Sequence, residues 1–279
     1  MPVVAINGKH PGPTVWLSGA IHGDELNGVE VVRRVLPRID QRTLRGAIIA
    51  VPVVNVFGFI EQSRYLPDGR DLNRSFPGSS RGSMASQLAA LFMKEVVMQC
   101  DLGIDLHTAA AHRTNVPQVR AYLDDEATLA LATAFGAPFI VDARLRDGSV
   151  RAAATKKGIK VLLYEAGQIH RFDEAAVETG VNGVLRVLEA MEMGTWETPP
   201  FKSPIEIRTT RWVRARRSGL MQLDVELSDE VSKGDAIGSI SDALGNRSAR
   251  VTAPTSGHVI ALNQNPLVNQ GDALVHLAT

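Results

Sequence analysis

Two potential metal ligands stand three residues apart near the start of the chain. His22 and Glu25 lie in the segment Ser18–Gly28, between the apolar run Thr14–Leu17 and a pattern with helical spacing. An imidazole and a carboxylate suit Zn²⁺ better than Mg²⁺ or Ca²⁺. A His-x-x-Glu pair is nevertheless common by chance and more often combines a core histidine with a surface glutamate. The pair therefore indicates a site only if a third ligand exists.

A second histidine, far downstream, supplies the missing ligand type. His107 lies near the end of the alternating strand expected over Leu102–Thr108, which also carries Asp105 on the same face. Zinc hydrolases use three protein ligands, two histidines and a glutamate among the known sets, and leave a fourth position open. We predict that His22, Glu25 and His107 bind one zinc ion per chain.

Two aspartates near these ligands have the right chemistry to orient the imidazoles. Asp24 and Asp105 are plausible partners for the ring nitrogens that do not face the metal.

Hydrolysis also requires a group that accepts a proton from water and returns it to the leaving group. Glu165 ends the apolar strand expected over Lys160–Glu165, which is an unfavourable place for a carboxylate without a role. We take Glu165 as the candidate base. The alternative is a carboxylate that pairs with a nearby arginine or caps the following turn.

A long loop supplies cations and a further donor. Residues 55–82 show no periodicity, and so long a loop in a compact domain is usually functional or disordered. Arg64, Arg70 and Arg74 lie in this loop and can stabilise an oxyanion or bind a substrate carboxylate, to which Asn73 can add a donor. Taken alone, each arginine is better explained as a solvated surface residue.

The elements that must position these residues alternate between strands and helices. Strands are expected at 14–17, 47–54, 102–108, 139–141 and 160–165. Helices are expected at 25–36, 83–99, 126–135 and 150–157, with a longer one over 177–191. This alternation predicts an α/β fold with a mixed, mostly parallel sheet flanked by helices. Ligands of such sheets gather outside the carboxyl ends of the strands.

The composition changes after residue 194. Residues 195–204 contain three prolines and no periodicity, so we expect a linker there between a hydrolase domain at 1–194 and a second domain at 205–279. Val231–Ile237 recurs 37 residues later as Val268–Leu274, which predicts a small C-terminal all-β barrel or sandwich. This domain resembles a biotinyl/lipoyl-like barrel, but its hairpin tip, 242–248, has no carrier lysine.

Composition and charge limit the possible partners. The chain has 279 residues, with 30 Lys and Arg against 30 Asp and Glu, so no overall charge attracts nucleic acid or anionic membranes. Cys100 is the only cysteine, and neither a signal sequence nor a long apolar span is present. We expect a cytoplasmic protein with a small-molecule substrate. A homodimer or higher homo-oligomer is the usual assembly.

Four motifs in order carry a family resemblance. The chain resembles the succinylglutamate desuccinylase/aspartoacylase family in Gly19-x-x-His22-Gly23-Asp24-Glu25, Asp71-Leu72-Asn73-Arg74, Asp105-Leu106-His107-Thr108 and Tyr164-Glu165-x-Gly167. The resemblance implies a carboxypeptidase-like fold, zinc held by the two histidines and the first glutamate, and Glu165 as base and proton shuttle. It further implies Arg64 as the oxyanion stabiliser, and Asn73 with Arg74 as substrate binders. Arg64 and Arg70 could exchange roles, because the segment from Arg64-Tyr65 to Asp71 is one residue longer than in aspartoacylase.

The expected activity is therefore zinc-dependent hydrolysis of the amide bond of an N-acyl amino acid or a similar small carboxylated amine. Two alternatives remain open. The same residues would serve a zinc carboxypeptidase that cleaves short peptides, or a zinc-binding regulatory protein in which catalysis has decayed.

Overall fold

The structure is a computed structural model, and it describes residues 1–246 and 248–279. Arg247, in the hairpin tip noted above, lies outside the described residues. The helices are α1 (Asn27–Val35), α2 (Val56–Ile60), α3 (Met84–Glu95), α4 (Glu126–Phe135), α5 (Val150–Thr155) and α6 (Glu174–Ala190). The strands are β1 (Val4–Asn7), β2 (His10–Gly19), β3 (Arg45–Val51), β4 (Leu102–His107), β5 (Arg113–Ala121), β6 (Phe139–Asp142), β7 (Lys160–Gly167), β8 (Ile205–Ile207), β9 (Thr210–Arg214), β10 (Gly219–Leu223), β11 (Glu230–Val231), β12 (Ala236–Ser241), β13 (Ala249–Thr252), β14 (Gly257–Asn263), β15 (Leu267–Val268) and β16 (Ala273–Ala278).

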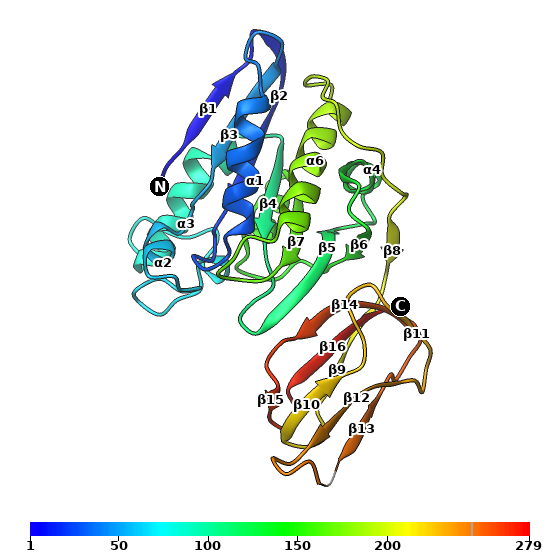
Figure 1. Ribbon diagram of the computed structural model, residues 1–279. Coiled ribbons are helices and arrows are strands. Elements are labelled where there is room, and N and C mark those ends of the chain that lie inside the picture. Colours follow the sequence, from blue (N-terminus) through cyan, green and yellow to red (C-terminus); the bar gives the residue numbers. More distant parts are fainter. Residues whose placement is uncertain (247) are drawn as a thin grey trace.

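One mixed sheet runs through the whole molecule (Figure 1). Within the described residues it has 12 strands in the order β1-β3-β2-β4-β7-β5-β14-β16-β9, with β6, β8 and β11 paired beside that path. Strands β3, β2, β4 and β7 run parallel, while β1 and β5 pair antiparallel with β3 and β7. The expected α/β fold with a mixed, mostly parallel sheet in its first part is confirmed.

Helices cover both faces of the first part of this sheet. α1, α4 and α6 pack on one face, where Val31, Phe135 and Leu185 belong to a single apolar core. α3 and α5 pack on the other face, where Phe92 and Ala154 share a second core with strand residues. Burial on both faces explains why β4 is buried at every position and why the strands are almost continuously apolar.

The first helix begins later than its apolar spacing suggests. α1 starts at Asn27, and Leu26 in the N-cap position makes no side-chain hydrogen bond. The amide of Glu25 donates to the carbonyl of His22 at 3.1 Å, which closes a tight turn before the helix. His22 and Glu25 therefore both lie on the turn that follows β2.

Several elements escape sequence analysis. The loop at 55–82 contains the five-residue helix α2, capped by Asn55 through the amide of Gly58, and a 3₁₀ turn at Leu72–Arg74. Such short helices show no periodicity. Strand β5 contains Pro117, which disfavours a strand assignment. The register of β5 with β7 shifts between Asn115 and Gln118, around this proline.

The C-terminal part is built entirely of strands. β13, β12, β10 and β15 form a second, four-stranded antiparallel sheet in the described residues. Its Ile240 shares an apolar core with Val259 and Leu277 of the large sheet. The sequence repeat appears as two equal turns, because Asp235 accepts a hydrogen bond from the amide of Ser232 and Asp272 accepts one from the amide of Asn269, both at 2.8 Å.

The two parts of the chain share strands and a core. β14 pairs with β5, and β8 pairs with β6. Val116, Phe139 and Ile260 pack together across this junction. The boundary expected at 195–204 thus connects parts of one continuous sheet, and the division into two domains stays a prediction. No helix among the described residues combines the length and the apolar character needed to cross a bilayer.

Candidate metal and hydrolytic site

Three adjacent parallel strands end at the candidate site. β2 ends at Gly19, and His22 and Glu25 follow on the next turn. His107 is the last residue of β4, and Glu165 of β7 is its register partner. The predicted ligands and the predicted base therefore meet at the carboxyl edge of the sheet, where α/β folds collect ligands.

His22, Glu25 and His107 form one buried cluster. Each offers a ligand atom such that all three atoms lie within 4.8 Å of one another. His22 Nδ1 is 2.7 Å from Glu25 Oε1, and His107 Nδ1 is 2.8 Å from Glu25 Oε2. The two Nδ1 atoms and the carboxylate thus converge on one point, as three donors to a single metal ion must.

The second nitrogen of each imidazole faces another carboxylate. His107 Nε2 is 2.8 Å from Asp105 Oδ2, and His22 Nε2 is 3.2 Å from Asp71 Oδ1. Carboxylates in such positions orient ligating imidazoles and make them better donors. Asp105 contacts the imidazole of His107, as expected of an orienting residue. The imidazole of His22 contacts Asp71 and not Asp24, which we expected to orient it.

Buried negative charge accumulates around the cluster. Burial alone would raise the pKa of Glu25, but His22 and His107 outweigh it and hold that pKa well below its usual range. Burial, reinforced by Glu25, raises the pKa of Asp24, and Asp24 Oδ1 is buried without a hydrogen-bond partner among the described residues. Burial would lower the pKa of His107, yet the charges of Asp105 and Glu25 raise it well above its usual value. Such a donor set, dry and rich in carboxylates, fits a divalent cation.

Glu165 is held at the edge of the same cavity. Its side chain is 17 % exposed, and Asn115 Nδ2 donates to Glu165 Oε2 at 2.8 Å. Arg120 Nη1 lies 3.9 Å from the other oxygen, so the arginine pairing considered as an alternative role is present but long. A carboxylate that is fixed by one donor and open to a cavity can accept and return a proton.

The long loop brings three of its four candidate residues to the cavity. Arg64 Nη2 donates to Asp71 at 2.9 Å, and Arg64 Nη1 lies 3.4 Å from Glu25 Oε1. Asn73 and Arg74 line the cavity, and Asn73 Oδ1 accepts a hydrogen bond from a backbone amide at the start of α5. Among the described residues, the side-chain Nδ2 of Asn73 has no acceptor and can donate to a ligand.

Arg70 does not reach the site. Its side chain is 62 % exposed and lies 3.6 Å from Asp68, and it does not line the cavity. The amide of Leu66 donates to the Arg70 carbonyl at 3.0 Å, which closes a surface turn. Of the two arginines that could exchange roles, the structure places only Arg64 beside the cluster.

A cavity of about 740 Å³ opens over the cluster and Glu165. Its lining within the described residues is strongly cationic, with Arg64, Arg74, Arg113, Arg120, Arg144, Arg146 and Arg151. The carboxylates among the same lining residues are Glu25, Asp142 and Glu165. This excess of positive charge favours anionic ligands.

Arg151 is a lining residue that sequence analysis missed. It is 6 % exposed, Arg151 Nη2 donates to the Arg144 carbonyl at 2.8 Å, and Nη1 is buried without a partner in the part of the chain that the structure describes. Burial, with the nearby charge of Arg120, lowers the pKa of Arg151 to about 10. A buried arginine without a carboxylate partner indicates a binding residue, but the burial of Arg151 cannot be predicted from the sequence. Trp212 and His276 of the C-terminal strands also line the cavity.

Comparisons with known proteins agree with this geometry. A family model described as the succinylglutamate desuccinylase/aspartoacylase catalytic domain matches residues 11–191, well over half of the chain. An N-alpha-acetyl-L-2,4-diaminobutyric acid deacetylase from Halomonas elongata is 28% identical over 294 residues, covering 100% of this chain and 85% of the relative.

Solved structures show the same relationship over the whole chain. A succinylglutamate desuccinylase/aspartoacylase from Rhodobacter sphaeroides is 28% identical with a TM-score of 0.89, covering 99% of this chain and 88% of the other. The product-bound ectoine utilization protein EutE from Ruegeria pomeroyi is 26% identical with a TM-score of 0.90, covering 100% and 88%. The relative from Halomonas elongata is named a deacetylase, and the matching family model is named for desuccinylases and aspartoacylases, which supports an enzyme that acts on amides. The chain belongs to the succinylglutamate desuccinylase/aspartoacylase family.

Proposed function

We propose that the protein is a zinc-dependent deacylase that hydrolyses the amide bond of an N-acyl amino acid or a similar small carboxylated amine. The observation that carries this proposal is the shared cavity, in which the buried His22, Glu25 and His107 cluster, Glu165 and a set of arginines face the same space. Two histidines and one glutamate suit zinc, and so do the carboxylates of Asp105 and Asp71 that contact the Nε2 atoms of His107 and His22.

His22, Glu25 and His107 would hold a zinc ion, which would act as a Lewis acid on the scissile carbonyl and would lower the pKa of a water molecule to about 7. Glu165 takes the proton of the attacking water and returns it to the amine nitrogen as the C–N bond breaks, which leaves a carboxylic acid and an amine. Arg64 donates to the oxyanion that develops on the carbonyl oxygen. Arg74 and Asn73 hold the carboxylate of the substrate.

The charge of the cavity also favours some substrates over others. Its volume of about 740 Å³ suits a small molecule. The relative from Halomonas elongata is named for 2,4-diaminobutyric acid, an amino acid with an amine in its side chain. The arginines of the cavity repel such a side-chain ammonium group. We therefore expect N-acyl amino acids without a side-chain cation to be better substrates of this chain than those that carry one.

The test measures zinc content and hydrolysis together. Wild type and Glu165→Gln are purified with zinc and assayed on a panel of N-acyl amino acids, N-alpha-acetyl-2,4-diaminobutyrate and short peptides. We expect about one zinc per chain in both proteins, and in the variant a loss of kcat of at least about a hundredfold because its amide cannot accept the proton.

Glu178→Gln on the exposed face of α6 is the matched control and should hydrolyse as wild type does. Full activity in zinc-free protein, or in Glu165→Gln, would rule out the mechanism. Turnover of the peptides alone would instead identify a carboxypeptidase.

A further inference from the structure

A second cavity lies in the C-terminal part, between the edge strands of its two sheets. β9 ends the path of the large sheet, and β13 ends that of the four-stranded sheet (Figure 1). Residues of both strands line a cavity of about 270 Å³, whose apolar lining includes Val213, Ile240 and Val251 of the core. We call this cavity the arginine pocket, after the five arginines that also line it: Arg211, Arg214, Arg216, Arg217 and Arg250.

The arginine pocket is separate from the cavity over the metal cluster. Within the described residues, Trp212 is common to the two linings, and the other residues of each lining differ. The Trp212 ring is stacked on His276 with centroids 4.4 Å apart, so it forms part of a wall between the two spaces. The roles proposed above for substrate binding therefore do not account for the arginines of this pocket.

The positive charge of the pocket is not balanced by carboxylates. Among the described residues that line it, none is an aspartate or a glutamate. Apart from Arg217, its arginines have no carboxylate within ion-pair distance in the ranges 1–246 and 248–279, whereas Arg208, just before β9, lies 3.2 Å from Asp124. Like charges around one space repel each other, and a bound anion would relieve that repulsion.

The arginines come from separate elements that converge on one space. Two lie on β9, two lie in the bend after it, and Arg250 lies on β13. Arg214 Nη1 donates to the Gly271 carbonyl at 2.8 Å, which holds that guanidinium in place. Charged side chains on an edge strand also prevent pairing with other chains. That role explains arginines on either strand, but it does not explain why arginines of both sheets border one cavity without carboxylates.

The donors and the size of the pocket favour a phosphate group. Guanidinium groups bind phosphate oxygens in bidentate geometry. A phosphate ester carries a charge of about −1.5 to −2 at pH 7 and three acceptor oxygens, so it can engage more arginines than one carboxylate can. The volume lies below the range of about 300 to 1,000 Å³ that is usual for drug-sized ligands, so the ligand must be compact. The balance of 30 basic and 30 acidic residues disfavours nucleic acid.

We propose that the arginine pocket is a binding site for a small, soluble phosphorylated molecule. The phosphate lies among the guanidinium groups of the two edge strands, and the rest of the ligand contacts the apolar lining. The site is independent of the proposed deacylase function, because it shares none of the residues to which that function assigns a role. Its test therefore requires no hydrolysis.

The test measures binding of inorganic phosphate to zinc-loaded protein by calorimetry, at about pH 8 where phosphate carries close to two negative charges. We expect a phosphate site with a Kd below about 1 mM, and succinate of equal charge should bind it at least about fivefold more weakly. Arg216→Gln combined with Arg250→Gln should weaken phosphate binding at least about tenfold, because two charged donors are removed. Both arginines are exposed, so the variant should fold as wild type does.

Two controls locate the bound phosphate. The cavity over the metal cluster is also cationic, so phosphate that binds there should be weakened by Arg74→Gln, which should leave the site in the arginine pocket unchanged. Arg208→Gln removes an exposed arginine of the C-terminal part that lies outside the pocket, and it should bind phosphate as wild type does.

Several outcomes would overturn the proposal. These are equal phosphate affinity of the double variant and wild type, phosphate binding that only Arg74→Gln weakens, and succinate binding as tight as phosphate binding. Vesicles containing phosphatidylglycerol and a short oligothymidylate are titrated in parallel. If wild type binds either of them but not phosphate, the arginines serve a lipid or nucleic-acid surface instead. If the double variant aggregates but still binds phosphate, they serve to protect the sheet edges.

Discussion

The metal cluster is tied to the interior by a chain of side-chain hydrogen bonds. Trp16 Nε1 donates to Ser18 Oγ at 3.2 Å, and Ser18 Oγ donates to Asp105 Oδ1 at 2.8 Å. Asp105 Oδ2 in turn meets His107 Nε2. Each group in this chain is buried. The orientation of the His107 ring is thus set from the core before any metal arrives, which limits the reorganisation that binding requires.

We expect Asp105→Asn to weaken zinc binding by roughly 10- to 100-fold, because an amide is a poorer acceptor for the imidazole N–H. Competition with a calibrated chelator measures the affinity. Asp101→Asn is the control, because Asp101 accepts a hydrogen bond from the amide of Thr14 beside the same strand but does not touch the cluster. Equal zinc affinity of Asp105→Asn and wild type would contradict an orienting role for Asp105.

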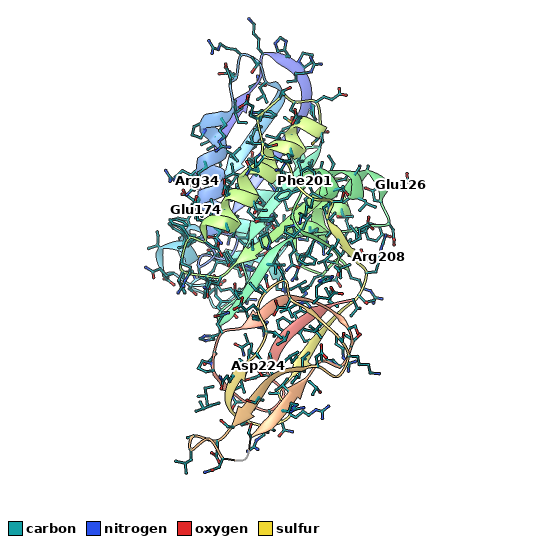
Figure 2. All side chains as sticks on the ribbon, turned by 45° about the vertical axis from the view of Figure 1, so that its right-hand side comes forward. Arg34, Glu126, Glu174, Phe201, Arg208 and Asp224 are labelled. Carbon is teal, nitrogen blue, oxygen red and sulfur yellow. The ribbon has the colours of Figure 1, made fainter. Side chains whose placement is uncertain are left out.

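At the level of elements, a network of charges joins α1 and α6, two of the helices that cover one face of the sheet. Glu30 of α1 accepts hydrogen bonds from Arg33 and Arg34, both at 2.6 Å. Arg34 also donates to Glu174 at the start of α6 at 2.8 Å, and these two side chains lie side by side in Figure 2. The arginines, with Arg33 making the largest contribution, lower the pKa of Glu30 to about 2.

This shift predicts a pH-dependent effect on stability. A carboxyl group whose pKa falls from about 4.5 to about 2 on folding stabilises the protein fully above pH 4.5, and the effect disappears as the pH falls through 2. Glu30→Gln should lower Tm by about 2 °C at pH 7, after allowance for solvent screening. The gap between variant and wild type should narrow below pH 4.5 in thermal scans. Glu126→Gln, at an exposed first-turn position of α4, should show no such gap, and a gap for Glu30→Gln that is constant down to pH 2 would disprove the ion-pair explanation.

Sequence analysis succeeded where the signal is local. Glu126–Phe135 was expected as a helix and is α4, because Asp125 caps it and a glycine follows it. The ligands follow strand ends whose apolar runs are easily recognised. Arg151 and His276 show the limit, because each has one buried side-chain nitrogen without a partner among the described residues, and its burial depends on residues far away in the chain. Strand β5 was hidden by Pro117 and by pairing that is entirely non-local.

On the scale of the whole molecule, the C-terminal part is a component of the site. The large sheet continues from β7 through β5 into β14 and β16, as Figure 1 shows. β9 and β16 contribute Trp212 and His276 to the cavity, while β14 supports the strand that carries Asn115. Removal of residues 205–279 would expose the apolar junction around Val116 and open the cavity wall. The two parts of the chain therefore share one apolar junction and one cavity.

Strand β5 also restricts where the chain can change in length. Arg113 and Asn115 are two residues apart and share one face of the strand, where Arg113 lies over the Trp212 ring and Asn115 donates to Glu165. One alanine inserted after Thr114 would reverse the parity of the strand and turn these two side chains to opposite faces. We expect this insertion to abolish hydrolysis, whereas the same insertion after the exposed Leu244 should leave the rate within about twofold of wild type, as assays of both proteins would show. An insertion after Leu244 changes the facing of no side chain that the cavity needs, whereas in β5 each side chain must point to one particular face of the sheet.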